Sequence, residues 1–194
     1  ARILQQEETP RSELVNLVEV HLARIAPTIR YAIGQDNNHA TTEAAALFAA
    51  GAWLERCGHS RGRHWNHMGR FWLENRVAYL IEPAGSFSQY SVNYHRLMLD
   101  TLCIAELWRV WLDQSKFSTR FYQRARAATR WLAAMTDPAT GEVANIGAND
   151  GANLLPLTEA DYRDFRPSLA LASTLFSPTS YPSVDGGVCV TALS

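Results

Sequence analysis

Apolar residues recur at intervals of three and four along most of the chain, which is the spacing of one face of an α-helix. The clearest stripe consists of Leu97, Thr101, Ile104, Ala105, Trp108, Trp111 and Leu112. Comparable stripes predict further helices that start after Thr9-Pro10, start after Asn38, and cover about 63–81, 121–135 and 159–176. Short connections between consecutive helices favour antiparallel helical hairpins. The pattern therefore predicts an all-α fold.

Two prolines and the last residues set limits on this helical pattern. We expect Pro27 to interrupt the first helix and Pro167 to kink the last one, because proline removes a helix hydrogen bond and clashes with the preceding turn. Residues 188–192 change to the two-residue period of a β-strand. Because Ala1 starts in the middle of a pattern, we expect a fragment, with a helical domain over 1–176 and a linker and first strand over 177–194.

Composition and charge exclude several classes of protein. The chain has 194 residues, of which 47% are apolar and six are tryptophan, and this is enough for one domain with a buried core. A net charge of −1 argues against a nucleic-acid partner. Membrane insertion is not expected, because no apolar run approaches the ~20 residues that cross a bilayer. The three cysteines are widely spaced, so we expect no disulfide framework. The oligomeric state is left open.

The segment Asn37-Asn38-His39 stands at the expected start of a helix. Helix N-termini are electropositive and carry unpaired N–H groups, so they favour anions. Asparagine is also a preferred helix cap, and capping alone accounts for part of the segment. Two asparagines and a histidine are more than a cap needs, which favours a binding site. Glu43, four residues after His39, either orients its imidazole or is a first-turn acid favoured by the helix dipole.

A second polar segment contains Tyr90, Asn93, Tyr94, His95 and Arg96. Tyr94 continues the stripe of Leu97 and Thr101 backwards, so we expect it on the inward side, at the N-terminal edge of the helix. A tyrosine in that place is commonly a packed aromatic with a satisfied hydroxyl. Beside Asn93 and His95, it is also a candidate for proton transfer.

Two further groups of residues have competing interpretations. Asn149 and Asp150 belong to the polar loop 145–153, which either lines a cleft or forms simple turns. His59, His64 and His67 have the composition of a metal site, but nearby arginines would repel a cation and no cysteine or acidic residue completes a zinc set. A solvated basic surface is the preferred interpretation, and we expect no metal ion or cofactor.

These segments, taken in order, resemble the heparinase II/III-like family of polysaccharide lyases. Residues 37–45 resemble the family's N-N-H-x-x-x-E-A block, and residues 85–96 resemble its G-S-[FY] and Y-H block. Residues 145–151 and 162–167 resemble a later pair of segments. The chain departs from the family at Ala84 and Gln89, where acidic residues are often found.

The resemblance implies an (α/α) toroid, incomplete in this chain, followed by a β-sandwich domain. It implies β-elimination on a uronate-containing anionic polysaccharide or oligosaccharide, with Tyr94 as base, acid or both. Asn38 and His39 would contact the substrate carboxylate. The substrate-binding candidates are Asn37, Glu43, Tyr90, Asn93, His95, Arg96, Asn149 and Asp150. The resemblance also favours a periplasmic or secreted location.

The chemistry of elimination gives these residue types a purpose. The C5 hydrogen of a uronate is a weak acid, and donors on the carboxylate would stabilise the developing enolate. A tyrosine, with a pKa of about 10, needs cationic or hydrogen-bonded surroundings to act as a base. We expect His95, Arg96 and the helix N-terminus to supply them. Two alternatives stay open: a non-catalytic glycan-binding relative, and a toroid-fold hydrolase that uses Glu43 and Asp150 as paired carboxyls.

Overall fold

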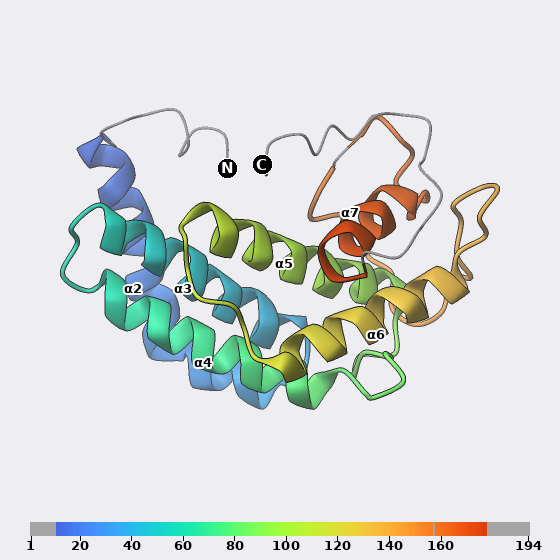
Figure 1. Cartoon of the computed structure of the whole chain (residues 1–194), viewed down its shortest axis with the longest axis horizontal. Coiled ribbons are helices and arrows are strands. Elements are labelled where there is room, and N and C mark those ends of the chain that lie inside the picture. The colour runs from blue at the N-terminus through green and yellow to red at the C-terminus, as the bar shows by residue number, and fades with distance from the viewer. Residues whose placement is uncertain (1–10, 157, 178–194) are drawn as a thin grey trace. The chain divides into compact units, whose positions relative to one another are not determined.

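The structure, a computed structural model, describes residues 11–156 and 158–177 (Figure 1). This part of the chain forms six α-helices: α2 (Ser12–Gly34), α3 (Asn38–Arg56), α4 (Gly62–Leu80), α5 (Val92–Trp111), α6 (Thr119–Met135) and α7 (Arg166–Phe176). Its only extended pairings are two isolated bridges, Ile81 with Phe87 and Thr136 with Val143. The prediction of a mostly helical chain is confirmed. The expected linker and strand over 178–194, and the cap at Thr9-Pro10, lie outside the described residues.

The chain divides into two compact units. Among the described residues, the first unit extends to Arg76 and includes Ala105–Lys116, and the second contains Val77–Ile104 and the part of the chain from Phe117 onward. In the first unit α2 packs against α3. Its core is formed by Leu22, Ile29, Leu47, Ala52, Trp53, Leu54, Trp65 and Leu112.

Glycines bring α3 and α4 into close contact in the first unit. A Cβ atom on Gly51 would overlap the backbone nitrogen of Asn66, and one on Gly69 would overlap the backbone nitrogen of Phe48. The side chain of Asn66 donates a 2.9 Å hydrogen bond to the carbonyl oxygen of Phe48. The two helices therefore meet backbone to backbone, and a buried amide fixes their register.

The expectation that Pro27 interrupts the first helix is wrong, because α2 runs through it. Pro27 is exposed, whereas Leu22 before it and Ile29 after it are buried in the core. Apolar packing on both sides of the proline holds the helix together across the lost hydrogen bond.

The first turns of α5 are buried on nearly every side in the second unit. Met98, Leu99 and Leu102 are fully buried. Leu97 and Ile104, which belong to the predicted stripe, are only half-buried. Thr101 and Ala105, which also belong to the stripe, are buried, so α5 is buried on several faces and the stripe does not mark a single inward one. Tyr94, which continues the stripe backwards, is half-buried.

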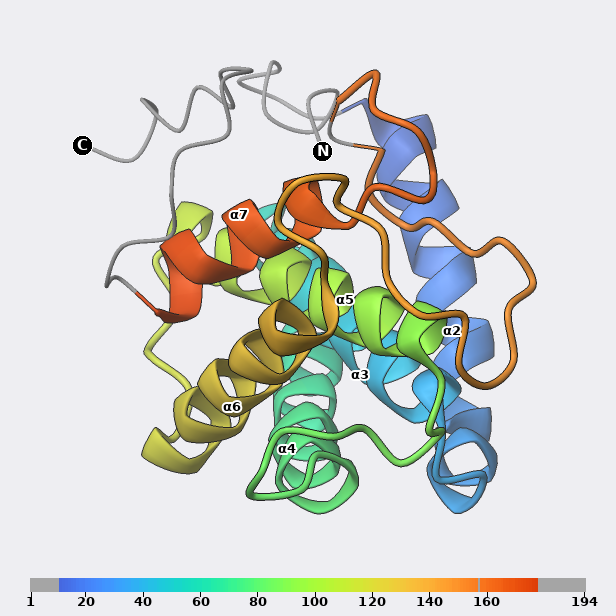
Figure 2. The same ribbon diagram turned by 90° about the vertical axis from the view of Figure 1, so that its right-hand side faces the viewer.

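The last helix begins later than the sequence predicts, at Arg166 instead of about residue 159. Pro167 stands in its first turn, where its missing N–H costs nothing, and it does not kink the helix. Upstream, Asp161 and Asp164 accept the backbone N–H groups two residues ahead, at 2.8 and 2.9 Å. These local bonds compete with helix formation. From Arg166 onward α7 packs against α6 (Figure 2).

Candidate functional site

The predicted site residues are divided between the two units. Asn37, Asn38, His39 and Glu43 belong to the first unit. The second unit contains Tyr90, Asn93, Tyr94, His95, Arg96, Asn149 and Asp150. The convergence of the two groups on one cleft stays a prediction.

In the first unit, Asn37 caps α3. Its side-chain oxygen accepts the backbone N–H of His39 at 2.9 Å. The cap therefore uses the backbone of His39 and does not use its imidazole, which is exposed. Asn38 is buried. No hydrogen bond joins Glu43 to His39, and burial raises the pKa of the Glu43 carboxyl, although His39 lowers it in part. One carboxyl oxygen of Glu43 is buried without a hydrogen-bond partner among the described residues.

In the second unit, Tyr94 is joined to Asp150. The tyrosine hydroxyl donates a 2.6 Å hydrogen bond to Asp150 Oδ2. The carboxylate also accepts the backbone N–H of Ala152 at 3.1 Å and a longer contact of 3.4 Å from the side chain of Asn93. The structure thus brings together Asn93, Tyr94 and Asp150, which the sequence placed in two separate segments.

Ser91 fixes the loop that carries Asp150 against the start of α5. Its hydroxyl donates a 2.5 Å hydrogen bond to the carbonyl oxygen of Ala148 and accepts the backbone N–H of Tyr94 at 3.1 Å. Val92 donates its backbone N–H to the carbonyl oxygen of Ile146. Figure 2 shows this loop, in orange, beside the first turns of α5.

The contact with Asp150 decides the protonation state of Tyr94. The hydrogen bond to Asp150 raises the pKa of the Tyr94 phenol, with smaller contributions from desolvation and from the negative charge of Asp150. The same bond lowers the pKa of the Asp150 carboxyl. The expectation that the surroundings of Tyr94 lower its pKa is therefore wrong, and the pair exists as a phenol and a carboxylate at neutral pH.

His95 and Arg96, which were expected to influence Tyr94, point elsewhere. The His95 ring stacks on Trp131 at 4.5 Å and its Nε2 lies 2.9 Å from the carbonyl oxygen of Ala128. Burial lowers the pKa of His95 to about 4, so the imidazole is neutral at physiological pH. Its 1% exposure favours a structural role in the core.

Arg96 is a buried anchor for the later loop. Its guanidinium donates hydrogen bonds to the carbonyl oxygens of Tyr162, at 2.6 Å, and Ala152, at 3.2 Å, and to Asn93 Oδ1, at 3.1 Å. The group also lies over the rings of Tyr162 and Phe165, 4.8 and 4.0 Å from their centroids. Arg96 thereby holds both ends of the 152–165 segment to α5.

Tyr162 joins the site but was not among the residues singled out from the sequence. Its hydroxyl donates to Asn149 Oδ1 and lies 3.5 Å from Asn93 Oδ1. The only signal was its position at the start of the 162–167 segment that resembles the lyase family.

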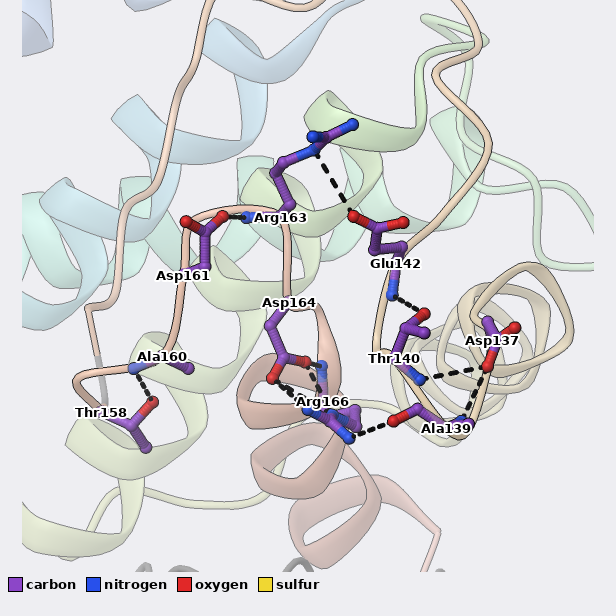
Figure 3. Close-up of polar contacts among 10 residues, drawn as sticks. All are labelled: Asp137, Ala139, Thr140, Glu142, Thr158, Ala160, Asp161, Arg163, Asp164 and Arg166. Carbon is purple, nitrogen blue, oxygen red and sulfur yellow. Dashed lines mark hydrogen bonds and ion pairs between the residues drawn. The ribbon is translucent and has the colours of Figure 1, made fainter.

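A pocket of about 150 Å³ lies beside Asn93 and Tyr162, and neither Tyr94 nor Asp150 lines it. Its polar lining consists of Asn93, Glu142, Asn145, Asn149, Tyr162 and Arg163. Arg163 Nε and Glu142 Oε1 form an exposed ion pair of 3.7 Å on the lining (Figure 3). Amides, a phenol and one guanidinium are groups that hydrogen-bond sugar hydroxyls and carboxylates.

The loops that carry Glu142 and Arg163 are fixed by local hydrogen bonds (Figure 3). Asp137 accepts the backbone N–H groups of Ala139 and Thr140, at 2.7 and 3.2 Å. Arg166 pairs with Asp164 at 2.7 Å and donates to the carbonyl oxygen of Ala139 at 2.9 Å. The ion pair lowers the pKa of Asp164 and raises that of Arg166. The start of α7 is thus tied to the turn that follows α6.

The histidines of the first unit show no metal arrangement. His59 and Arg61 both contact Glu19, the former at 3.1 Å, while His64 and His67 are exposed. Within residues 11–156 and 158–177, no three His, Cys, Asp or Glu side chains are grouped closely enough to hold a metal ion. No helix in this described region has the length and apolar character that crossing a bilayer requires.

Comparison with protein-family profiles, with curated proteins and with solved structures finds no match to this chain.

Proposed function

We propose that this chain is the helical part of a polysaccharide lyase that cleaves a uronate-containing anionic glycan by β-elimination. The proposal includes the (α/α) toroid as the arrangement of its helical hairpins. It rests on the ordered resemblance of four sequence segments and on the surroundings of Tyr94. The single observation that carries it is the 2.6 Å hydrogen bond from the Tyr94 hydroxyl to Asp150 at the start of α5.

This hydrogen bond supports Tyr94 as the proton donor. Because its pKa is raised, the phenol keeps its proton at neutral pH and can give it to the departing glycosidic oxygen. In the elimination the C5–H bond breaks, its electron pair forms the C4–C5 double bond, and the C4–O4 bond breaks as O4 takes the Tyr94 proton. A base role for Tyr94 is less favourable, because the ionised Asp150 opposes formation of a phenolate.

The proposal assigns the remaining steps to the first unit: the resemblance implies that Asn38 and His39 contact the substrate carboxylate, and residue chemistry adds a base role for His39. Asn38 would donate to the substrate carboxylate and so stabilise the enolate. The imidazole of His39 would accept the C5 proton, since imidazole is the side chain suited to proton transfer near neutral pH.

The pocket beside Asn93 supports a sugar ligand. Its volume of about 150 Å³ is on the scale of one sugar ring, and Asn145, Asn149 and Tyr162 can exchange hydrogen bonds with ring hydroxyls. Arg163 adds a cation for a carboxylate on the bound sugar.

The test is incubation of the chain with a panel of uronate polysaccharides, followed by product analysis. Elimination creates a double bond conjugated with the carboxylate, and absorbance near the ultraviolet edge rises. Reducing ends that form without this absorbance would contradict the lyase proposal.

A glycoside hydrolase is the second candidate, and the charge states of two carboxyls favour it. Burial raises the pKa of Glu43, as a general acid requires, while the Tyr94 hydrogen bond lowers the pKa of Asp150, as a base or nucleophile requires. This function also needs the two carboxyls about 5–10 Å apart. It predicts saturated products, whereas a glycan-binding relative predicts binding without any product.

A further inference from the structure

Helix α6 carries a concentration of positive charge that the chain as a whole does not have. It contains four arginines and no acidic residue: Arg120, Arg124, Arg126 and Arg130. None of the four forms an ion pair in the part of the chain that the structure describes. The whole chain, in contrast, has a net charge of −1. The charge on α6 is therefore local, and no ion pair among the described residues neutralises it.

A pocket of about 460 Å³ lies along one face of this helix. Its lining includes Pro83, Thr119, Tyr122, Gln123, Arg126 and Arg130. Four of these residues follow one another at intervals of four, three and four, so they share a helix face. The turn that carries Pro83 is held to the helix at Gly85, where a Cβ atom would overlap the carbonyl oxygen of Ala127. The pocket thus lies between α6 and a turn that packs closely against it.

One of the two arginines that line the pocket is preorganised before any ligand binds. Arg126 Nε donates a 3.0 Å hydrogen bond to the carbonyl oxygen of Phe176, at the end of α7. Its two terminal nitrogens make no hydrogen bond with the described residues. A guanidinium fixed through Nε presents its terminal N–H groups with little further loss of entropy on binding. Arg130, one turn away, adds a second fork about 6 Å further along the helix axis.

We propose that the pocket of Arg126 and Arg130 is a binding site for a compact oligoanion, a small molecule with two or more oxyanion groups on a polar frame. Guanidinium forks bind carboxylate, sulfate and phosphate groups in a bidentate way. Two forks one helical turn apart match two such groups, and Thr119 and Gln123 can bond the frame between them. A pocket of about 460 Å³ with two arginines on its lining favours a small ligand over a long polymer. This inference does not depend on the proposed lyase activity.

Calorimetric titration of the full chain at low ionic strength tests the site, with pyrophosphate and citrate as probes. The chain is expected to bind at least one probe in a 1:1 ratio, and uncharged glycerol is expected not to bind. Arg126→Ala/Arg130→Ala should weaken binding by about tenfold or more, because hydrogen bonds to charged groups are lost. The affinity of Arg126→Lys/Arg130→Lys should lie between that of the parent and that of the double alanine variant, since the positive charge remains but the planar guanidinium is lost. Tighter binding of citrate indicates a carboxylate ligand, and tighter binding of pyrophosphate a phosphate ligand.

The matched control is Arg24→Ala/Arg30→Ala, which removes the same charge from exposed positions on α2. It should keep the parent affinity within about twofold, because long-range surface charge is weakly felt. Circular dichroism and thermal melting establish whether each variant is folded. If a double variant at Arg126 and Arg130 does not fold, the single variant Arg130→Ala is titrated in its place. An absence of binding to both probes would overturn the proposal, and so would an equal loss in the α2 control. Tighter binding of a single-stranded oligonucleotide than of either probe would also overturn it, in favour of a polymer-binding surface.

Discussion

The hydroxyl of Tyr94 donates a 2.6 Å hydrogen bond to Asp150 Oδ2, which connects the first turn of α5 to the loop between α6 and α7. The bond stabilises the neutral phenol and the charged carboxylate together. We predict that Asp150→Asn lowers the pKa of Tyr94 towards its usual value of about 10. Nuclear magnetic resonance of ring-labelled tyrosine, assigned with Tyr94→Phe, measures this directly. Glu159→Gln, an exposed change before the same α7, should leave the titration as it is, and an unchanged midpoint in Asp150→Asn would contradict the account.

Asp100 is predicted to make the folded chain less stable as the pH rises. Burial raises the pKa of this carboxyl to about 7, although Ser168 and Arg96 lower it in part. The folded chain therefore holds a proton that the unfolded chain releases at lower pH, and stability falls between about pH 4 and pH 7. Asp100→Asn stays neutral at every pH. The free energy of unfolding of the variant minus that of the parent should therefore be larger at about pH 8 than at about pH 5, by about 2 kcal/mol.

Urea unfolding of both proteins at the two pH values measures that difference. His95 acts in the opposite direction, since its pKa is lowered to about 4 and the unfolded chain takes up its proton first as the pH falls. Its effect is common to the parent and the variant and cancels in the comparison. Asp113→Asn, an exposed change, should show no pH-dependent difference. The same difference at both pH values would show that Asp100 is ionised throughout.

Two glycine substitutions, one inside the close contact of α3 and α4 and one outside it, are predicted to change stability in opposite directions. Gly69→Ala would place a methyl group on the backbone of Phe48, and overpacking of this kind costs about 2–3 kcal/mol. Gly34→Ala, at the exposed end of α2, meets nothing within 4 Å and should stabilise the chain by up to about 1 kcal/mol. Thermal and urea unfolding give both values. Equal melting temperatures for the two variants would be inconsistent with the tight helix contact.

Asn37 and His39 are predicted to separate stability from activity. The cap of α3 uses the Asn37 side chain and the backbone N–H of His39. Asn37→Ala should therefore cost about 1 kcal/mol of stability, whereas His39→Ala should melt close to the parent. If His39 acts in turnover, the kcat of His39→Ala should fall by a larger factor than its KM rises, because the contribution of the imidazole grows in the transition state. A large loss of stability in His39→Ala with normal kinetics would remove it from the proposed site.

The helices could be predicted from the sequence because their signals are local. The start of α3 at Asn38 follows from a capping residue and apolar spacing, and the end of α6 at Met135 follows from apolar spacing. Pro27 was misjudged because the packing that carries α2 past it comes from α3. The start of α7 was misjudged because Asp161 and Asp164 form turns that compete with a helix of suitable composition.

The candidate site was only partly predictable. Tyr94, Asn93 and Asp150 were each singled out, but their contact depends on a loop that returns to α5 from far along the chain. The direction of the Tyr94 pKa shift follows from that contact, so sequence neighbours such as His95 and Arg96 suggested the opposite direction. Apart from its place in the 162–167 segment that resembles the lyase family, Tyr162 carried no signal, because an aromatic in a polar loop is compatible with many roles.

The rate at which the chain forms unsaturated product from a uronate polysaccharide tests the central claim most directly, with Tyr94→Phe as the variant. The change removes only the hydroxyl, and a positioned acid contributes about 10²–10⁴-fold in rate. We predict a loss of that size in a variant that remains folded, and no loss in Tyr31→Phe, which removes a hydroxyl from a 77% exposed tyrosine on α2. Elimination by Tyr94→Phe at the parent rate would contradict the account, because another group would then supply the proton.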